Sequence, residues 1–228
     1  MIASLCRLSA ARIARSWRLW VGLGIWCSVA VACAVVARQN GWAHGADRVL
    51  SSVYGALALP LAACTIAGAA FGGRSMIAST APLVAFGASP WRAALASIGV
   101  AVLASALLGA CLAASVACVA HGTADPPMAR DAIVSAYVGG LGGAAYATWF
   151  ALGTTIGRRG GGRLVFLGLD WLLGAEGTPT ALATPRGHLR SLLGGASALN
   201  VSERCSASML VALMALCTIL ACRSIKRR

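Results

Sequence analysis

Residues 93–120 read AALASIGVAVLASALLGACLAASVACVA, 28 consecutive positions without a charged side chain. A helix needs about 20 apolar residues to cross a hydrocarbon core of about 30 Å, so this stretch is long enough to span a membrane. Every fourth position carries a small residue, in the series Ser97, Ala101, Ser105, Gly109, Ala113 and Ala117. The stretch therefore predicts a transmembrane helix with one face suited to close helix packing.

Further apolar runs lie on both sides of this stretch. Residues 19–37, 49–73 and 132–156 are each long enough to cross a bilayer, and shorter runs begin at 164 and 209. Charged residues make up only 11% of the 228 residues, against about 25% in soluble domains. We therefore predict one all-α, polytopic transmembrane domain over residues 1–228, a bundle of about six helices, or four if the last two runs are not full spans.

The distribution of basic residues predicts the orientation of this bundle. If the N-terminus is inside and the spans alternate, thirteen of the 19 Lys and Arg residues fall on the cytoplasmic side. Cytoplasmic loops carry such an excess, so both termini are predicted to be cytoplasmic. Residues 1–18 are basic and partly amphipathic, which predicts an interfacial N-terminal arm. The cations flank apolar runs without interleaved aromatics, which argues against a nucleic-acid partner.

The run 132–156 repeats the small-residue pattern of the run before it. The two series predict tight helix-packing faces, within one subunit or between two copies, although a chain rich in Ala and Gly also produces such series by chance. The residues expected at the centre of this packing are Ser105, Gly109, Gly139 and Gly143.

No catalytic, cofactor or metal site is predicted. All three histidines (His44, His121 and His188) lie in predicted external segments, so an intramembrane serine hydrolase would lack its base. The nine cysteines show neither CxxC nor Cys/His spacing. The only lysine, Lys226, is followed by Arg, which excludes a P-loop in this sequence. If ATP powers the protein, another chain must bind the nucleotide.

Asp170 is the one acidic residue inside an apolar run. A charge at bilayer depth costs about 3 kcal/mol and indicates a specific role. We predict a buried ion pair with Arg163, two helical turns earlier, or with a basic group of another helix. A place on a transport pathway and a position near the outer interface are the alternatives. The following residues 175–208 predict an external amphipathic segment, either an interfacial or re-entrant helix or a solvated loop.

The connection at residues 74–92 lies on the predicted cytoplasmic side and has a distinct composition. Residues 82–92 read PLVAFGASPWR, which predicts a short helix bounded by Pro82 and Pro90 and lying flat under the bilayer. Such a helix could move as a unit and offer apolar contacts to a soluble subunit; a simple interfacial loop is the alternative. The residues expected to make these contacts are Phe86, Ser89, Trp91 and Arg92.

With these features the chain resembles the membrane subunits of ABC transporters, specifically the type-2 (exporter-type) permease family. The resemblance lies in the basic N-terminal arm, the six spans with both ends inside, the polar external excursion before the last span, and Gly-Ala-Ser-Pro-Trp-Arg at 87–92. Haem-exporter permeases share this size and span count.

The resemblance implies a permease subunit that is not itself an enzyme. It implies three partners: a separate ABC ATPase that docks on residues 74–92, a second permease copy or paralogue, and membrane lipids. The Arg-rich, Lys-poor composition is typical of a GC-rich bacterial genome, so we expect a multi-pass protein of the bacterial inner (plasma) membrane. A non-transporting membrane scaffold or assembly factor is the alternative, and it predicts no ATPase partner. Lipid, peptide, drug and ion remain open as cargo.

Overall fold

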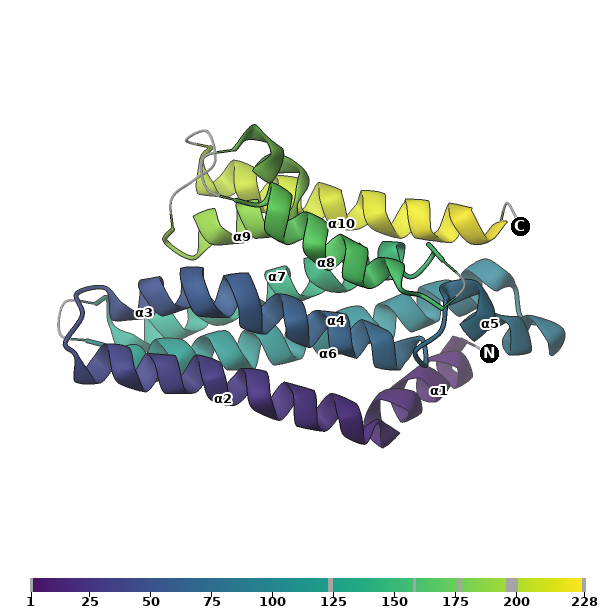
Figure 1. Ribbon diagram of the computed structural model, residues 1–228, viewed down its shortest axis with the longest axis horizontal. Coiled ribbons are helices and arrows are strands. Elements are labelled where there is room, and N and C mark those ends of the chain that lie inside the picture. The colour runs from purple at the N-terminus through teal and green to yellow at the C-terminus, as the bar shows by residue number, and fades with distance from the viewer. Residues whose placement is uncertain (1, 123–124, 158, 176–177, 196–200, 227–228) are drawn as a thin grey trace.

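The computed structural model describes residues 2–122, 125–157, 159–175, 178–195 and 201–226, which are almost entirely helical and include no strand. The longer helices lie roughly along one axis (Figure 1). The elements in chain order are α1 (Ile2–Arg15), α2 (Trp17–Gln39), α3 (Gly45–Val49), the π-helix η1 (Leu50–Ala58), α4 (Leu59–Ala70), α5 (Met76–Ala85), α6 (Pro90–Ala120), α7 (Met128–Gly153), α8 (Gly162–Leu173), the 3₁₀ helix η2 (Pro179–Ala183), α9 (Pro185–Leu192) and α10 (Glu203–Lys226).

The start of α1, the end of α10 and the whole of α5 lie at one end of the bundle, which we call the α5 end (Figure 1). The opposite end, which we call the α3 end, carries α3 and the start of α7. Of the basic residues that the sequence places on the cytoplasmic side, Arg158, Arg227 and Arg228 lie outside the described residues.

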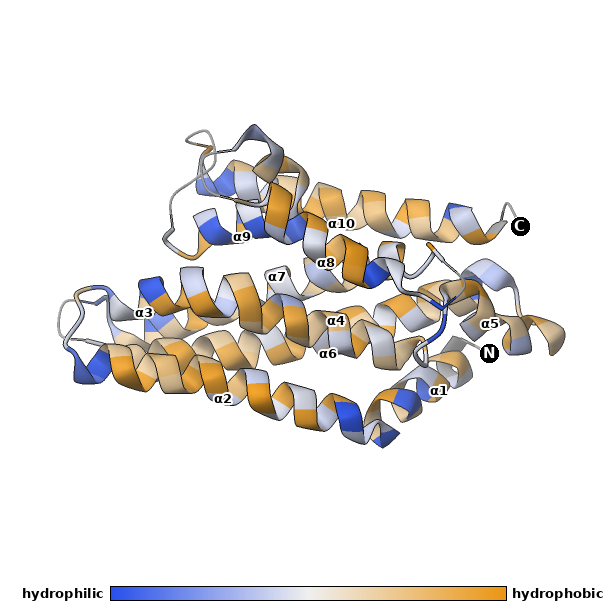
Figure 2. Ribbon diagram, in the orientation of Figure 1, coloured by the Kyte–Doolittle hydropathy of each residue, from blue (hydrophilic) through white to orange (hydrophobic). Residues whose placement is uncertain are grey.

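Four helical stretches are long and apolar enough to cross a membrane. They are α2, the continuous helix Gly45–Ala70 formed by α3, η1 and α4, helix α6, and residues Glu203–Ile225 of α10. These stretches are made mostly of apolar residues along their length (Figure 2), and many of their large apolar side chains are exposed; Leu103 of α6, for example, is 62% exposed. Soluble proteins rarely expose apolar surface on this scale. These helices make the chain a membrane-embedded protein, and the predicted all-helical class is confirmed.

The fourth and fifth predicted spans differ from these four. Helix α7 has 26 residues but is rich in Gly and aromatic residues, and it is largely buried among α4, α6 and α10. Helix α8 has only 12 residues, about 18 Å of helix, which is too short to cross the hydrocarbon core alone. The last span begins at Glu203 rather than at the predicted residue 209.

The second span changes its winding next to Pro60. Residues 50–58 form a π-helix directly before the α-helical turn that contains Pro60. Because proline has no N–H, it cannot donate to the carbonyl of Ala56 four residues earlier. The indole N–H of Trp171 in α8 donates to that carbonyl at 2.9 Å. The irregular turn in one helix is thus stabilised by a side chain from another.

Helices α6 and α7 form the largest contact in the bundle, and they meet at the predicted small residues. A Cβ placed on Gly109 would lie 2.4 Å from the carbonyl oxygen of Gly139, and one on Gly143 would lie 2.2 Å from that of Ser105. Only glycine allows the two backbones to approach this closely. The hydroxyl of Tyr54 donates to the carbonyl of Gly109 at 2.8 Å, which attaches the second span to the same contact.

Helix α9 folds back onto the bundle and packs against η1, α7 and α10. Leu189 is fully buried, in a notch where Gly55 of η1 and Gly142 of α7 lack side chains. For this region the sequence allowed two alternatives, an interfacial or re-entrant helix and a solvated loop. The structure shows a short helix with a buried face, which excludes a solvated loop for residues 185–192. Residues 176–177 and 196–200 of the predicted external segment lie outside the described part of the chain.

The predicted N-terminal arm is a helix, and one of its faces packs against the bundle. Helix α1 ends at Arg15, where Ser16 breaks the helix before α2 begins. Its buried face lies against α6, where the hydroxyls of Ser9 and Ser97 are 3.0 Å apart. The arm is therefore part of the helix packing at the α5 end.

Candidate functional site

The strongest candidate for a functional surface is the corner formed by α5, residues 86–89 and the first turn of α6, which we call the α5–α6 corner. Its base is attached to α7, because the N–H of Met76 donates to the carbonyl of Thr154 at 3.1 Å. The side chain of Ser75 caps α5 by accepting from the N–H of Ala78 at 3.3 Å. These bonds fix the start of α5 relative to the end of α7.

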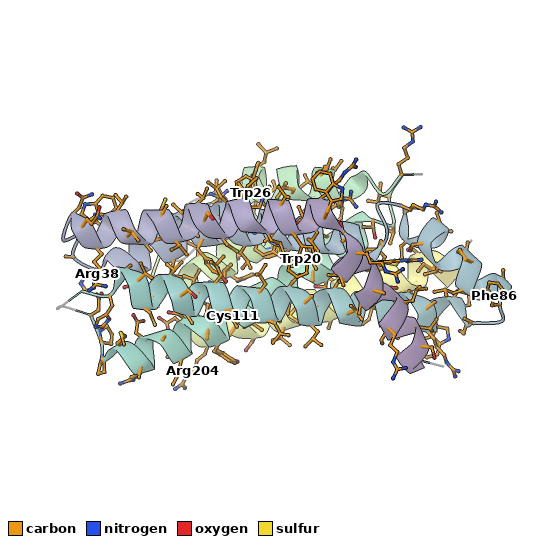
Figure 3. All side chains as sticks on the ribbon, turned by 90° about the horizontal axis from the view of Figure 1, so that it is seen from below. Trp20, Trp26, Arg38, Phe86, Cys111 and Arg204 are labelled. Carbon is orange, nitrogen blue, oxygen red and sulfur yellow. The ribbon has the colours of Figure 1, made fainter. Side chains whose placement is uncertain are left out.

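The tip of the corner projects away from the bundle (Figures 1 and 3). Helix α5 ends at Ala85, and the chain then turns through Gly87, whose φ of +83° favours glycine. The N–H of Ala88 donates back to the carbonyl of Leu83 at 3.0 Å, which closes the turn. Phe86 lies at this tip and is 91% exposed, so none of the described residues buries this large apolar side chain.

The corner differs in detail from the short helix predicted between Pro82 and Pro90. Pro82 lies inside α5, and Pro90 opens α6, so the helix of the corner comes earlier in the chain than predicted. Ser89 is the N-cap of α6 and is half-buried. Trp91 and Arg92 follow in the first turn of α6, where the guanidinium carbon of Arg92 lies 5.3 Å from the centroid of the Trp91 ring. The structure thus pairs Trp91 with Arg92 and places Phe86 apart from them at the tip.

Asp170 lies at a buried junction of three helices. Its side chain is completely buried, one carboxylate oxygen accepting from the hydroxyl of Tyr146 at 2.9 Å. The other oxygen accepts from the backbone N–H of Arg186 at 3.1 Å. Arg186 lies in the first turn of α9, whose free N–H groups and dipole favour a negative charge. Asp170 of α8 therefore caps α9 and attaches both helices to α7.

The predicted ion pair between Asp170 and Arg163 is not what the structure shows. Seven residues of α-helix separate the two side chains by about 10 Å along the axis, and each turns to a different neighbour. The guanidinium of Arg163 lies against α4, so close to Gly68 that a Cβ there would be 2.9 Å from Nη1. Its Nη1 atom is buried and has no hydrogen-bond partner within the described chain.

The α3 end carries the acidic residues that flank the spans. His44 lies 3.8 Å from Asp125, across the connections that precede α3 and α7. Asp47 lies in the first turn of α3, and Asp131 lies in the first turn of α7. Among the residues that the structure describes, no group of three or more His, Cys, Asp or Glu side chains could hold a metal ion.

The sequence matches no known protein family, and no curated protein matches it either.

Proposed function

We propose that this chain is the membrane-spanning permease subunit of an ATP-driven ABC exporter of the type-2 kind, energised by a separate ATPase subunit. The observation that carries the proposal is the α5–α6 corner, which presents an almost fully exposed Phe86 beyond the end of the bundle. An apolar side chain in this position is suited to insert into a pocket of a soluble partner. Trp91 and Arg92 add an aromatic and a cationic contact at its base.

The proposed orientation places the α5 end in the cytoplasm. That end carries the arginines of α1, of the connections before α5 and α8, and of the end of α10, while the acidic residues Asp47, Asp125 and Asp131 lie at the α3 end. An excess of Arg on one side is the established determinant of the cytoplasmic face. In this orientation both termini are cytoplasmic, and six membrane segments result if α7 and the α8–α9 pair accompany the four long spans. The composition favours a bacterial inner membrane.

The α5–α6 corner is connected to α6 and α7, so a displacement of the corner would be transmitted to the centre of the bundle. Helix α6 continues without interruption from Pro90 to Ala120, about 46 Å, so displacement of its first turn would tilt the whole helix. The bond between Met76 and Thr154 would carry the same displacement into α7. Movement at the corner would therefore act on the α6–α7 contact. A second permease copy or paralogue would complete the transporter.

Photo-cross-linking from position 86 tests the proposal. With p-benzoylphenylalanine in place of Phe86, we expect an adduct whose mass-spectrometric sequence contains a P-loop ATPase subunit. The matched control is the same substitution at Trp42, which is 46% exposed in the connection at the α3 end. The control is expected to give no ATPase adduct. If the purified chain carries no ATPase and position 86 gives no such adduct, the permease proposal is overturned in favour of a membrane scaffold.

A further inference from the structure

A cavity of about 640 Å³ opens at the α5 end, between the α1–α2 junction, α4 and the start of α8. Arginines from three separate segments line it, together with small and apolar side chains of α2, α4 and α8. The arginines are Arg12, Arg15, Arg18 and Arg163. We call this space the arginine cavity.

The break between α1 and α2 brings the first three of these arginines to one place. Ser16 adopts an extended conformation, with φ of −83° and ψ of 92°, which turns α1 away from the axis of α2 (Figure 1). The indole N–H of Trp20 donates to the carbonyl of Ala14 at 3.0 Å across the break. This hydrogen bond therefore stabilises the bend. Arg15 lies before the bend and Arg18 lies after it, and both line the cavity.

Arg163 enters the cavity from the opposite wall. The absence of a side chain at Gly68 makes room for its guanidinium, which fills that position closely. Burying a guanidinium donor without an acceptor is costly, and its Nη1 has none among the described residues. Four like charges around one space also repel one another, and no carboxylate is among the described residues that line the cavity.

These features call for an anion from outside the protein. We propose that the arginine cavity binds a phosphate group, carried either by an anionic phospholipid head group or by a free phosphate compound. Guanidinium groups bind phosphate oxygens through paired N–H donors. Basic pockets between membrane helices at the cytoplasmic surface are typical sites for anionic lipids. Leu19 and Leu164 at the cavity wall would accompany the first part of an acyl chain.

The experiment uses the full chain in nanodiscs and in detergent. Retention of phosphatidylglycerol relative to phosphatidylcholine is measured by native mass spectrometry after extraction from mixed nanodiscs. Binding of inorganic phosphate is measured by calorimetry in a neutral detergent. The variants are Arg163→Gln and Arg12→Gln, and the matched control is Arg7→Gln, which removes the same charge from an exposed position on α1 outside the cavity.

We expect the wild-type chain and Arg7→Gln to retain phosphatidylglycerol preferentially. The preference of each cavity variant should fall about tenfold, the loss expected when one hydrogen bond between charged groups is removed. Phosphate binding with the same dependence on Arg163 and Arg12, without a lipid preference, would assign the site to a free phosphate compound. If Arg163→Gln fails to fold, Arg12→Gln decides alone, because Arg12 is only half-buried. Equal retention of both lipids and equal phosphate binding by all folded variants would overturn the proposal.

Discussion

The hydroxyl of Tyr146 in α7 donates a 2.9 Å hydrogen bond to Asp170 in α8, and both side chains are completely buried. The second oxygen of the same carboxylate accepts the N–H of Arg186 and so caps α9. One carboxylate thus connects three helices in the region where the sequence predicts a fifth span. This arrangement gives Asp170 a structural role, because it joins α7, α8 and α9.

Replacing Asp170 by alanine should destabilise the α8–α9 region strongly. It leaves the Tyr146 hydroxyl and the Arg186 N–H without their acceptor, at about 1–3 kcal/mol for each. Asp170→Asn should be much milder, because an amide can accept from the N–H of Arg186 through its oxygen and donate to the hydroxyl of Tyr146 through its nitrogen. Thermal unfolding in detergent, followed by size-exclusion chromatography, measures the difference.

The same pair of variants separates a structural from a transport role. If the Asp170→Asn chain keeps both its stability and its activity, a role of Asp170 on a transport pathway is excluded. A stable Asp170→Asn chain without activity would show that the negative charge itself is needed.

Gly143→Ala should prevent the normal packing of α6 on α7. A Cβ at position 143 would lie 2.2 Å from the carbonyl oxygen of Ser105, so the helices must separate, and overpacking of this kind costs about 1–3 kcal/mol or more. Gly140→Ala is the matched control on the same helix, because its Cβ would meet its nearest neighbour at an ordinary 3.5 Å. The yield of monodisperse protein and its thermal stability should fall for the first variant only. Equal stability of both would contradict the observed contact.

Trp171→Phe should destabilise the bundle by about 0.6–2 kcal/mol, the range measured for hydrogen bonds between membrane helices. It leaves the Ala56 carbonyl without the indole donor that replaces the missing N–H of Pro60. Pro60→Ala returns a backbone N–H, so the loss caused by Trp171→Phe should be smaller in the Pro60→Ala background. A double-mutant cycle on apparent unfolding free energies measures this coupling. Strictly additive effects would show that Trp171 acts through its ring alone.

Cysteine labelling tests the orientation. Cys205 is exposed in the first turn of α10 and should react with a membrane-impermeant maleimide in intact cells. The Cys205→Ser chain should not be labelled from outside. Adding Ala85→Cys to that chain should give a further labelled site only after the membrane is permeabilised, since Ala85 is exposed near the tip of the α5–α6 corner. Labelling of Ala85→Cys in intact cells would reverse the proposed orientation.

If the chain is the proposed permease, Phe86→Asp should abolish its association with an ATPase subunit without changing the stability of the chain. The side chain is 91% exposed, so its replacement removes no internal packing, whereas a carboxylate cannot enter an apolar pocket without a large desolvation cost. Co-purification of the ATPase and ATP-dependent transport are the measurements. Trp42→Asp, which alters an exposed aromatic residue at the α3 end, should affect neither. Unchanged ATPase binding by Phe86→Asp would exclude the corner as the docking site.

Much of the helical layout could be predicted because it depends on local properties of the chain. The long uncharged runs predicted the spans formed by α2, by the continuous helix Gly45–Ala70 and by α6, and the small-residue series predicted which faces could approach closely. The extent of the fifth span could not be predicted. The conformation of residues 164–192 depends on the packing of Leu189 into the notch at Gly55 and Gly142. Those two glycines lie far from Leu189 in the sequence, so this packing could not be predicted.

The partners of Asp170 illustrate the same division. A carboxylate in an apolar run showed that some polar group must face it, and spacing along one helix favoured Arg163. The actual donors are the hydroxyl of Tyr146 on α7 and the backbone N–H of Arg186 at the start of α9. Tyrosine carries no charge and a backbone N–H is present at nearly every residue, so neither stands out in a sequence.

The sequence by itself determined that this chain is helical, apolar enough for a bilayer, and basic at the connections on one side. These properties follow from hydropathy and charge, which add up residue by residue along the chain. The tertiary structure alone decided that the region of the predicted fifth span forms two short helices, α8 and α9, that Asp170 caps α9, and that Arg163 faces the arginines of the α1–α2 junction across one cavity. Each of these depends on the close approach of segments distant in the chain. Such approaches are set by where glycines let backbones touch and where buried polar groups find partners.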